Sequence, residues 1–263
     1  MTSTRTLAVA SALALTGAAG AWAGSASERV ERTLTLPASR QVVVENFNGS
    51  VAVTGWDQAQ VRLVAVKTAR AATDGRARAY LHDLGVQIDQ RGDKLVIRTK
   101  SPGAEGGIKG WLACAGVDGE VSYQLSLPRE TELSVSTVNG NVEIVGLVAP
   151  VRAASTNGNV VVLEVGGEVD ASSVNGSIRV GMRRAEPRSA MELSTVNGSI
   201  LVILPDDFRA YVDARTTNGS VGSDLPLLVE GHRSRSRLVG RLNGGITRLT
   251  LRTTNGSIWL KKP

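Results

Sequence analysis

A short motif with Asn-Gly at its centre recurs along this chain, and it constrains the fold more than any other feature. One copy reads Thr137-Val138-Asn139-Gly140-Asn141-Val142-Glu143-Ile144. Every copy has Asn-Gly, then Ser or Asn, then Val or Ile, and the others lie at residues 155–162, 173–180, 195–202, 216–223 and 253–260, with an early copy at 46–53. A repeat this regular predicts a structure that is itself built from repeated units.

Apolar residues alternate with more variable ones on both sides of each Asn-Gly pair. A period of two along the sequence predicts β-strands that bury one face. When the copies are aligned on their Asn-Gly pairs, we expect Val160 to point inward between Val142 and Ile178, and Val161 to point outward. The inward columns contain small and β-branched residues and no aromatic residue, which predicts a thin core.

The Asn-Gly pairs predict where the chain turns, because Asn and Gly both tolerate positive φ. We expect positive φ at Gly158 and Gly176 in particular. The predicted structural turn residues are Asn139, Gly140, Asn157, Gly158, Asn175, Gly176, Asn197, Gly198, Asn218, Gly219, Asn255 and Gly256.

Two all-β architectures fit this pattern. Asn-Gly between alternating runs is typical of β-hairpins, which would give an antiparallel β-meander or sandwich. A β-solenoid, similar to a parallel β-helix, would instead stack one repeat on the next. Successive asparagines at positions 139, 157, 175, 197 and 218 are 18, 18, 22 and 21 residues apart, which suits one turn of a solenoid. We favour the solenoid because stacked repeats explain why one residue type recurs in each inward column.

The first 23 residues have the order of a secretory signal peptide. Arg5 supplies the positive start, residues 7–21 are apolar, and Ala21-Trp22-Ala23 matches an A-x-A cleavage site. The apolar part is short and rich in Ala and Gly, so a membrane span is the weaker interpretation, and no later segment is long and apolar enough to span. We expect the protein to be exported to the periplasm or the cell surface and to begin at or near Gly24.

Residues 24–130 predict a strand-rich cap region in front of the repeat body at 131–263, and the two together form one continuous domain. Strands are expected at 42–44, 61–66 and 95–97 and a loop at 101–110. Residues 74–84 predict one short helix, with Asp74 as its N-cap and an apolar face formed by Ala77, Tyr80, Leu81 and Leu84. The cap would cover an open end of the solenoid.

Residues that could support catalysis or bind a metal are scarce. Cys114 is the single cysteine and His82 and His232 are the only histidines, which argues against a zinc site and against an activated thiol. The sequence therefore predicts no catalytic, cofactor-binding or metal-binding residues, and we expect no enzyme.

An acidic pair offers the one alternative to that expectation. Asp206 and Asp207 could supply half of the carboxylate pair of a polysaccharide-acting β-helix enzyme. The second carboxylate would have to come from elsewhere in the chain, and no sequence pattern selects one among Glu143, Glu164 and Asp213.

Basic residues gather in the long gap between Asn218 and Asn255, where the repeat is interrupted by an insertion. The formal net charge is +6, and the insertion contributes Arg233, Arg235, Arg237 and Arg241 within ten residues. In an extended conformation Arg233, Arg235 and Arg237 would project to one side. We favour a solvated loop for this segment. Because arginine pairs with phosphate and carboxylate groups, contact of these four residues with an anionic envelope polymer is the functional alternative. Nucleic acid is disfavoured because no aromatic residue interleaves the arginines.

The combined motifs resemble a known family. The stretch Phe47-Asn48-Gly49-Ser50-Val51-Ala52-Val53-Thr54-Gly55-Trp56-Asp57, the strand at 121–128 and the later Thr-x-Asn-Gly-Ser-Ile copies are similar to the bacterial putative-adhesin family of β-strand repeats, a domain of unknown function. Members of that family are exported or envelope-associated, and the resemblance implies no catalytic residues.

These observations favour a non-catalytic, adhesin-like scaffold or interaction module of the cell envelope or cell surface. Its expected partner is an anionic envelope polymer or an envelope protein, with no cofactor. The alternatives are a polysaccharide-acting enzyme and a sensor or regulatory partner of a membrane protein. The sequence makes no prediction about the oligomeric state.

Overall fold

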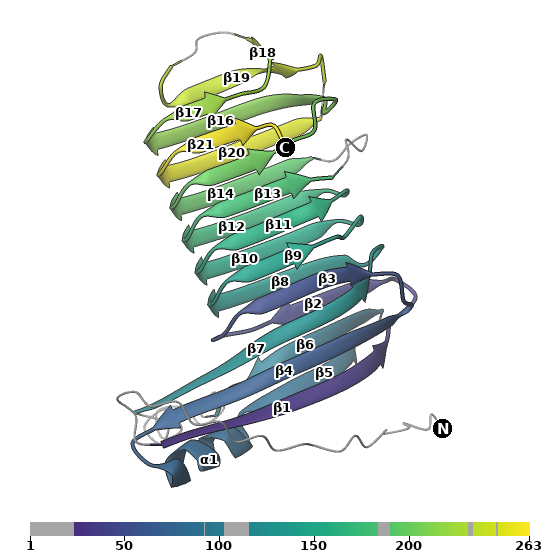
Figure 1. Cartoon of the computed structure of the whole chain (residues 1–263), viewed down its shortest axis with the longest axis vertical. Helices are drawn as coiled ribbons and strands as arrows, with labels where there is room; N and C mark the ends of the chain where they lie inside the picture. The colour runs from purple at the N-terminus through teal and green to yellow at the C-terminus, as the bar shows by residue number, and fades with distance from the viewer. Residues whose placement is uncertain (1–23, 92, 103–115, 184–189, 231–233, 246) are drawn as a thin grey trace.

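The structure, a computed structural model, describes residues 24–91, 93–102, 116–183, 190–230, 234–245 and 247–263. These residues form an all-β protein with one short helix and two mixed sheets (Figure 1). The predicted signal peptide, Cys114, Arg233 and most of the predicted loop at 101–110 lie outside the described residues. Among the residues that are described, no helix has the length and apolar character needed to cross a membrane.

Each Asn-Gly repeat contributes one strand to each sheet. The strands that precede the Asn-Gly pairs lie in an 11-stranded sheet, here called sheet B: β2 (Gln41–Glu45), β8 (Glu132–Asn139), β10 (Val151–Asn157), β12 (Val169–Asn175), β14 (Met191–Asn197), β16 (Ala210–Asn218) and β20 (Arg248–Asn255). The strands that follow the pairs lie in a 10-stranded sheet, sheet A: β3 (Val51–Trp56), β9 (Val142–Val145), β11 (Val160–Val165), β13 (Ile178–Met182), β15 (Ile200–Ile203), β17 (Val221–Ser223) and β21 (Ile258–Lys261).

Equivalent strands of neighbouring repeats pair in parallel and in register. Val151 on β10 lies opposite Val169 on β12, and Val169 lies opposite Met191 on β14. Parallel neighbours cannot be joined by a two-residue hairpin. The repeats therefore stack on one another, and the antiparallel meander is excluded for this part of the chain.

The core lies between the two sheets, where the inward columns meet. Val160 is fully buried and lies opposite Val142 on one side and Ile178 on the other, whereas Val161 is partly exposed. The predicted direction of these columns is confirmed. One-residue alternation is what places the apolar side of every strand in the core.

The end of the stack that contains the N-terminal strands is formed by antiparallel strands. In sheet A, β1 (Gly24–Thr35) pairs with β4 (Gln60–Ala71), which pairs with β7 (Val117–Pro128). In sheet B, β5 (Gly85–Arg91) pairs with β6 (Lys94–Lys100). The predicted strands at 42–44, 61–66 and 95–97 are confirmed as parts of β2, β4 and β6.

The predicted helix is confirmed as α1 (Asp74–Asp83), but its N-cap is Thr73 and not Asp74. Thr73 has extended backbone angles, and its side chain accepts a hydrogen bond from the backbone N–H of Arg76 at 3.3 Å. Leu81 and Leu84 are buried against the core, as the apolar face predicts.

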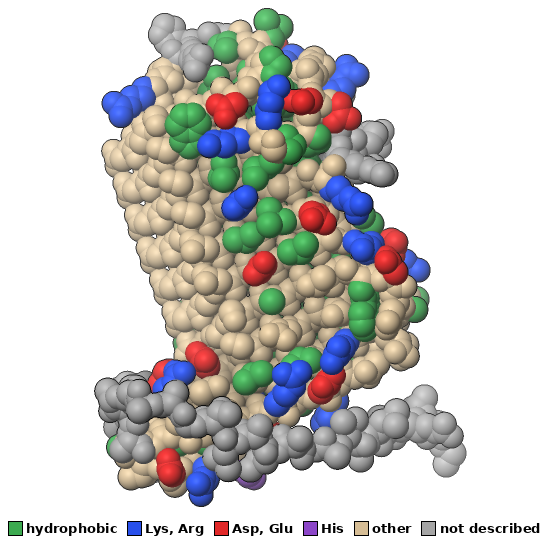
Figure 2. All heavy atoms as spheres, in the orientation of Figure 1, with side chains coloured by type: hydrophobic (Ala, Val, Ile, Leu, Met, Phe, Trp, Pro, Cys, Tyr) green, Lys and Arg blue, Asp and Glu red, His purple; other side chains and the backbone are tan. Residues whose placement is uncertain are grey.

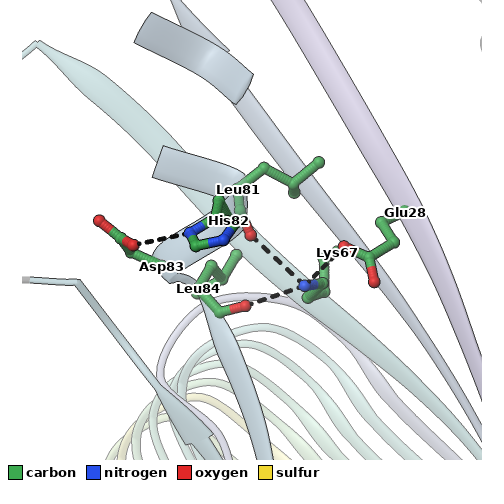
Figure 3. Close-up of polar contacts among 6 residues, drawn as sticks. All are labelled: Glu28, Lys67, Leu81, His82, Asp83 and Leu84. Atoms are coloured by element: carbon green, nitrogen blue, oxygen red, sulfur yellow. Dashed lines mark hydrogen bonds and ion pairs between the residues drawn. The ribbon is translucent and has the colours of Figure 1, made fainter. Parts of the chain in front are cut away.

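A buried lysine fixes the C-terminal end of α1 (Figure 3). The Lys67 ammonium on β4 donates to the backbone carbonyls of Leu84 at 3.0 Å and Leu81 at 3.4 Å, and it pairs with Glu28 on β1 at 2.7 Å. A cation is favourable here because the last carbonyls of a helix have no partner within the helix.

At the opposite end, the order of the strands in space differs from their order in the chain. β20 lies between β14 and β16, and β21 lies between β15 and β17. Figure 1 shows these yellow strands of the last repeat between green strands of earlier repeats. Before it reaches β20, the chain forms β18 (Leu227–Val229) and β19 (Arg237–Leu242). β19 pairs antiparallel with β16, on the side of β16 that faces away from β20.

Candidate anion-binding surface

The predicted turn residues line one edge of the stack, here called the corner edge. From Asn139 onward, the side-chain amide of each corner asparagine donates to the side-chain oxygen of the asparagine in the neighbouring repeat nearer the N-terminal end of the stack, at 2.7–2.8 Å. The ladder runs in the spatial order Asn48, Asn139, Asn157, Asn175, Asn197, Asn255, Asn218. The repeat of Asn255 lies between those of Asn197 and Asn218 and therefore continues the ladder without a break.

The corner glycines are required by close stacking, and the expectation of positive φ at Gly158 and Gly176 is wrong. Neither residue has φ in the left-handed range. Instead, a Cβ atom on Gly158 would lie 2.0 Å from the carbonyl oxygen of Gly140, and one on Gly176 would lie 2.0 Å from that of Gly158. Each repeat passes so close to the next that no side chain fits between them.

The polar groups of the corner edge form hydrogen bonds with one another. Figure 2 shows it as the tan surface at the left of the stack, without coloured side chains. Besides the asparagine ladder, Ser155 donates its hydroxyl to the carbonyl of Gly140 at 2.9 Å, and Ser173 does the same to Gly158. Groups that are already paired have little to offer a ligand, so we regard the corner edge as structural.

The strongest charge feature lies on the outward face of β20, β16 and β19. Inward-pointing residues of these strands belong to the core, so the alternate residues point to solvent. We call this surface the arginine face, and its arginines are Arg248 and Arg252 on β20, Arg215 on β16, and Arg237 and Arg241 on β19.

Strand register brings these arginines together. Arg215 lies directly opposite Arg252 on one neighbouring strand and Arg237 on the other. Two rows away on the same face, Tyr211 lies opposite both Arg248 and Arg241. Adjacent strands are about 4.8 Å apart, so each row places its side chains within reach of a single extended ligand.

Two of the five arginines are held by acidic neighbours. Arg215 makes a bidentate pair with the buried Asp213, with Nε–Oδ1 at 2.7 Å and Nη2–Oδ2 at 2.8 Å. The hydrogen bond to Asp213 raises the pKa of the Arg215 guanidinium. Arg241 pairs with Glu230 at 2.6 Å and lies over the Tyr211 ring, 5.5 Å from its centroid. These contacts fix the centre of the arginine face.

The other three arginines are exposed, and no described carboxylate pairs with them. They are Arg237, Arg248 and Arg252. With Asp213 and Glu230 counted against all five arginines, the arginine face has a formal charge of +3. Beside Arg248, a hollow of about 180 Å³ is lined by both acidic and basic side chains, among them Asp170 and Glu192, and marks the boundary of the positive surface.

Part of the predicted basic site is corrected by the structure. Arg235 lies in a tight turn in which the Ser234 backbone N–H donates to the Arg237 carbonyl at 3.1 Å, so the expected extended conformation is wrong. Arg235 and Arg237 therefore do not project from one strand. Arg237 and Arg241 belong to the arginine face, and Arg233 lies outside the described residues.

Sequence reasoning missed Arg215, Arg248 and Arg252. A signal for two of them exists: three residues before the corner asparagine, the repeats of Asn218 and Asn255 have Arg215 and Arg252, whereas the others have Glu45, Ser136, Ala154, Ser172 or Ser194. Only the insertion of β20 beside β16 makes these two arginines neighbours.

The structure separates two of the carboxylates that were considered as the second member of a glycosidase pair. Glu143 lies on β9 in sheet A and Asp213 on β16 in sheet B, and each points outward from its own sheet. Asp206 is paired with Lys262 at 3.1 Å. Glu143 and Asp213 therefore lie on opposite faces of the stack.

Solved structures resemble this fold at low sequence identity. A putative cell adhesion protein from Clostridium sporogenes has a TM-score of 0.51 and 9% identity, covering 89% of this chain and 100% of that one. A putative adhesin from Bacteroides fragilis has a TM-score of 0.38 and 10% identity, covering 89% and 97%. A putative lipid binding protein from Parabacteroides distasonis has a TM-score of 0.31 and 10% identity, covering 89% and 96%.

Sequence comparison is decisive for the family. No curated protein matches the chain. The model of a family of unknown function, Toastrack DUF4097, matches residues 3–261, which confirms the resemblance drawn from the repeats. This chain belongs to the Toastrack DUF4097 family.

Proposed function

We propose that this protein is a non-catalytic scaffold of the bacterial envelope or cell surface that binds an anionic polymer on its arginine face. The observation that supports this proposal is the in-register row of Arg252, Arg215 and Arg237 on three adjacent strands. Two of these arginines lack a described carboxylate partner, so their guanidinium groups are available to a ligand.

A polymer suits the arginine face better than a single small anion. The row of three arginines spans about 10 Å, because neighbouring strands are about 4.8 Å apart. Each guanidinium presents paired N–H donors that match one phosphate or carboxylate group. A chain of phosphodiesters offers successive charges that can meet successive arginines, whereas one phosphate meets only one or two of them.

The stack supplies the rigidity that such a surface needs. We interpret the two sheets as a β-solenoid of two-strand turns, in which each turn packs only against its neighbours. The asparagine ladder and the backbone hydrogen bonds fix the spacing from one repeat to the next. The name of the Clostridium sporogenes protein, a putative cell adhesion protein, agrees with a role at the cell surface.

The first test measures binding of poly(glycerol phosphate), a phosphodiester polymer, by titration calorimetry. Replacing Arg237, Arg248 and Arg252 by Ser should weaken binding by at least about tenfold and leave the melting temperature unchanged, because exposed and unpaired side chains contribute little to stability. The matched control replaces Arg179, Arg183 and Lys261 by Ser, which removes the same charge from exposed positions outside the arginine face. It should retain most of the affinity.

Salt and lipid separate the remaining explanations. Raising the salt from about 50 to 200 mM should weaken wild-type binding by about 20- to 40-fold, since about three phosphate contacts release counterions. Anionic phospholipid vesicles present phosphate as a headgroup layer, and stronger binding to vesicles than to the polymer would identify lipid as the phosphate source. Equal loss in both triple variants, or equal binding of neutral dextran, would contradict the proposal.

A further inference from the structure

One sheet edge at the N-terminal end of the stack is long and open. Among the described strands, β1 and β17 are the outermost strands of sheet A, and β5 and β18 those of sheet B. β1 has 12 residues, whereas β5 has seven and β17 and β18 have three each. Alternate N–H and C=O groups of β1 face away from β4. At the start of the strand the Ser25 N–H donates to the Asp74 side chain of α1 at 3.2 Å, and no described strand pairs with the rest of this edge. Such an edge is a template for another strand.

The charges at the centre of β1 are ordered in a way that fits pairing with itself. The sequence reads Glu28-Arg29-Val30-Glu31-Arg32, so the sign of the charge inverts about Val30. When two such strands pair antiparallel with Val30 opposite Val30, Arg29 of each copy faces Glu31 of the other, and Glu28 faces Arg32. Residues directly opposite in an antiparallel pair are close enough for their side chains to interact.

From this edge and its charge order, we propose that two copies of the protein associate end to end by antiparallel pairing of their β1 strands. The contact would be isologous, with a two-fold axis beside Val30. It would join sheet A of one copy to sheet A of the other in one continuous sheet. The N-terminal end of each stack would then lie at the centre of the dimer.

Within one copy, neither Arg29 nor Arg32 pairs with a described carboxylate. Glu28 pairs with Lys67 at 2.7 Å, as Figure 3 shows, and Glu31 pairs with Arg62 at 2.6 Å. Arg29 is exposed and has no described partner. Arg32 donates only to the backbone carbonyl of Glu31, at 3.3 Å. Pairing through β1 gives both arginines a carboxylate of the second copy.

Apolar side chains at the same end favour the same partner. Val30 and Leu34 on β1, and Val86 and Ile88 on β5, pack against the core but are only partly buried. A second stack placed against this end would remove their exposed area from water, which is favourable. Charged residues on an edge strand commonly prevent pairing, but here antiparallel pairing places opposite charges together.

The dimer has a functional consequence that rests on the proposed function. The arginine face lies on β16, β19 and β20, at the end of the stack far from β1 (Figure 1). An end-to-end dimer would carry one arginine face near each of its far ends. Two linked faces bind a long polymer, or two polymer chains, with greater avidity than one face.

Charge exchange at positions 29 and 31 tests the proposed register. Both side chains are exposed, so their replacement should leave the fold intact. Wild-type protein should sediment with twice the chain mass at micromolar concentration. Arg29→Glu and Glu31→Arg should each raise the dimer dissociation constant by at least about tenfold, because each places two pairs of like charges opposite one another. Lys261→Glu, a charge change at the other end of the stack, should leave the dimer unchanged.

Two rescues make the test specific. An equimolar mixture of the Arg29→Glu and Glu31→Arg chains should form a heterodimer, because position 29 of each chain again faces the opposite charge at position 31 of the other. The double variant Arg29→Glu/Glu31→Arg should recover the homodimer. A wild-type monomer at about 100 μM, or single variants that dimerise as tightly as wild type, would overturn the proposal and leave the edge open to a strand of another protein. Neither single variant alters the arginine face. Polymer binding can therefore be measured on the monomeric variants, and its result tests the proposed function separately from the dimer.

Discussion

Two residue positions show how local packing decides which side chain the chain can use. At the corners, Gly158 is fixed by the carbonyl of Gly140 and not by its own backbone angles. The same pair of repeats is held by the hydrogen bond from the Asn157 side chain to that of Asn139 at 2.8 Å. A corner residue therefore determines the packing against the neighbouring repeat as well as the geometry of its own turn.

Replacing Gly158 by Ala tests this explanation. The added Cβ would lie 2.0 Å from a backbone oxygen, so the two repeats must separate, and the free energy of unfolding should fall by at least about 2 kcal/mol. Gly75 at the start of α1 has no atom within 4 Å of the corresponding position, so Gly75→Ala should leave stability unchanged or raise it by up to about 1 kcal/mol. Denaturant titrations that give both variants the same stability would contradict the stacking argument.

Tyr123 is the other informative residue, because its phenol is fully buried within the stack. Its hydroxyl lies 2.7 Å from that of Thr99. Burial raises the pKa of Tyr123 to about 12, because the phenolate would lose its hydration. The folded protein therefore keeps the proton at a pH where the unfolded chain, with a tyrosine pKa of about 10, releases it.

That difference predicts a loss of stability at high pH with a definite sign. Below about pH 10 the phenol is protonated in both states and contributes no pH dependence. Between about pH 10 and 12 only the unfolded state ionises, so the free energy of unfolding should fall by about 2–3 kcal/mol. Tyr123→Phe should remove that part of the pH dependence. If urea titrations at pH 9 and 11.5 show the same loss in both proteins, this explanation is wrong.

Individual elements were predictable where the reason for them is local. The strands, their inward and outward faces and the helix α1 follow from periodicity, and the structure confirms them. Thr73 replaces Asp74 as the N-cap because its backbone is extended there and its hydroxyl meets the Arg76 N–H. The fold of Ser234–Arg237 into a turn depends on contacts with β17 and β16, made through the Arg235 and Ser236 carbonyls, which the sequence of the segment does not reveal.

The order of the last repeats was not predictable from the same pattern. Leu249, Leu251 and Thr253 on β20 occupy the columns that Val212, Ala214 and Thr216 occupy on β16. Any repeat can therefore pack against any other, and column chemistry cannot decide which one lies outermost. The antiparallel strand β19 is added beside β16 and turns the chain back, so the last repeat joins the stack on the other side of β16.

The whole molecule is a stack whose two ends differ in chemistry. One end has a long open strand with balanced charges, and the other has the arginine face formed by strands that are not consecutive in the chain. Export and the lack of an evident catalytic constellation were inferred from the sequence, whereas the arginine face required the strand order in space. The proposed polymer site therefore depends on how the repeats are arranged, whereas the proposed dimer depends on the edge of β1 and its charge order.

Cross-linking of engineered cysteines tests most directly whether insertion of the last repeat assembles the arginine face. Ser194 on β14 lies opposite Arg252 on β20, whereas Arg215 on β16 lies one strand farther away, at about 10 Å. A disulfide requires Cα atoms within about 7 Å. In a Cys114→Ser background, the insertion predicts that Ser194→Cys/Arg252→Cys forms a disulfide on mild oxidation and that Ser194→Cys/Arg215→Cys does not. A disulfide between positions 194 and 215, with none between 194 and 252, would show that the repeats stack in chain order and would contradict the arginine face.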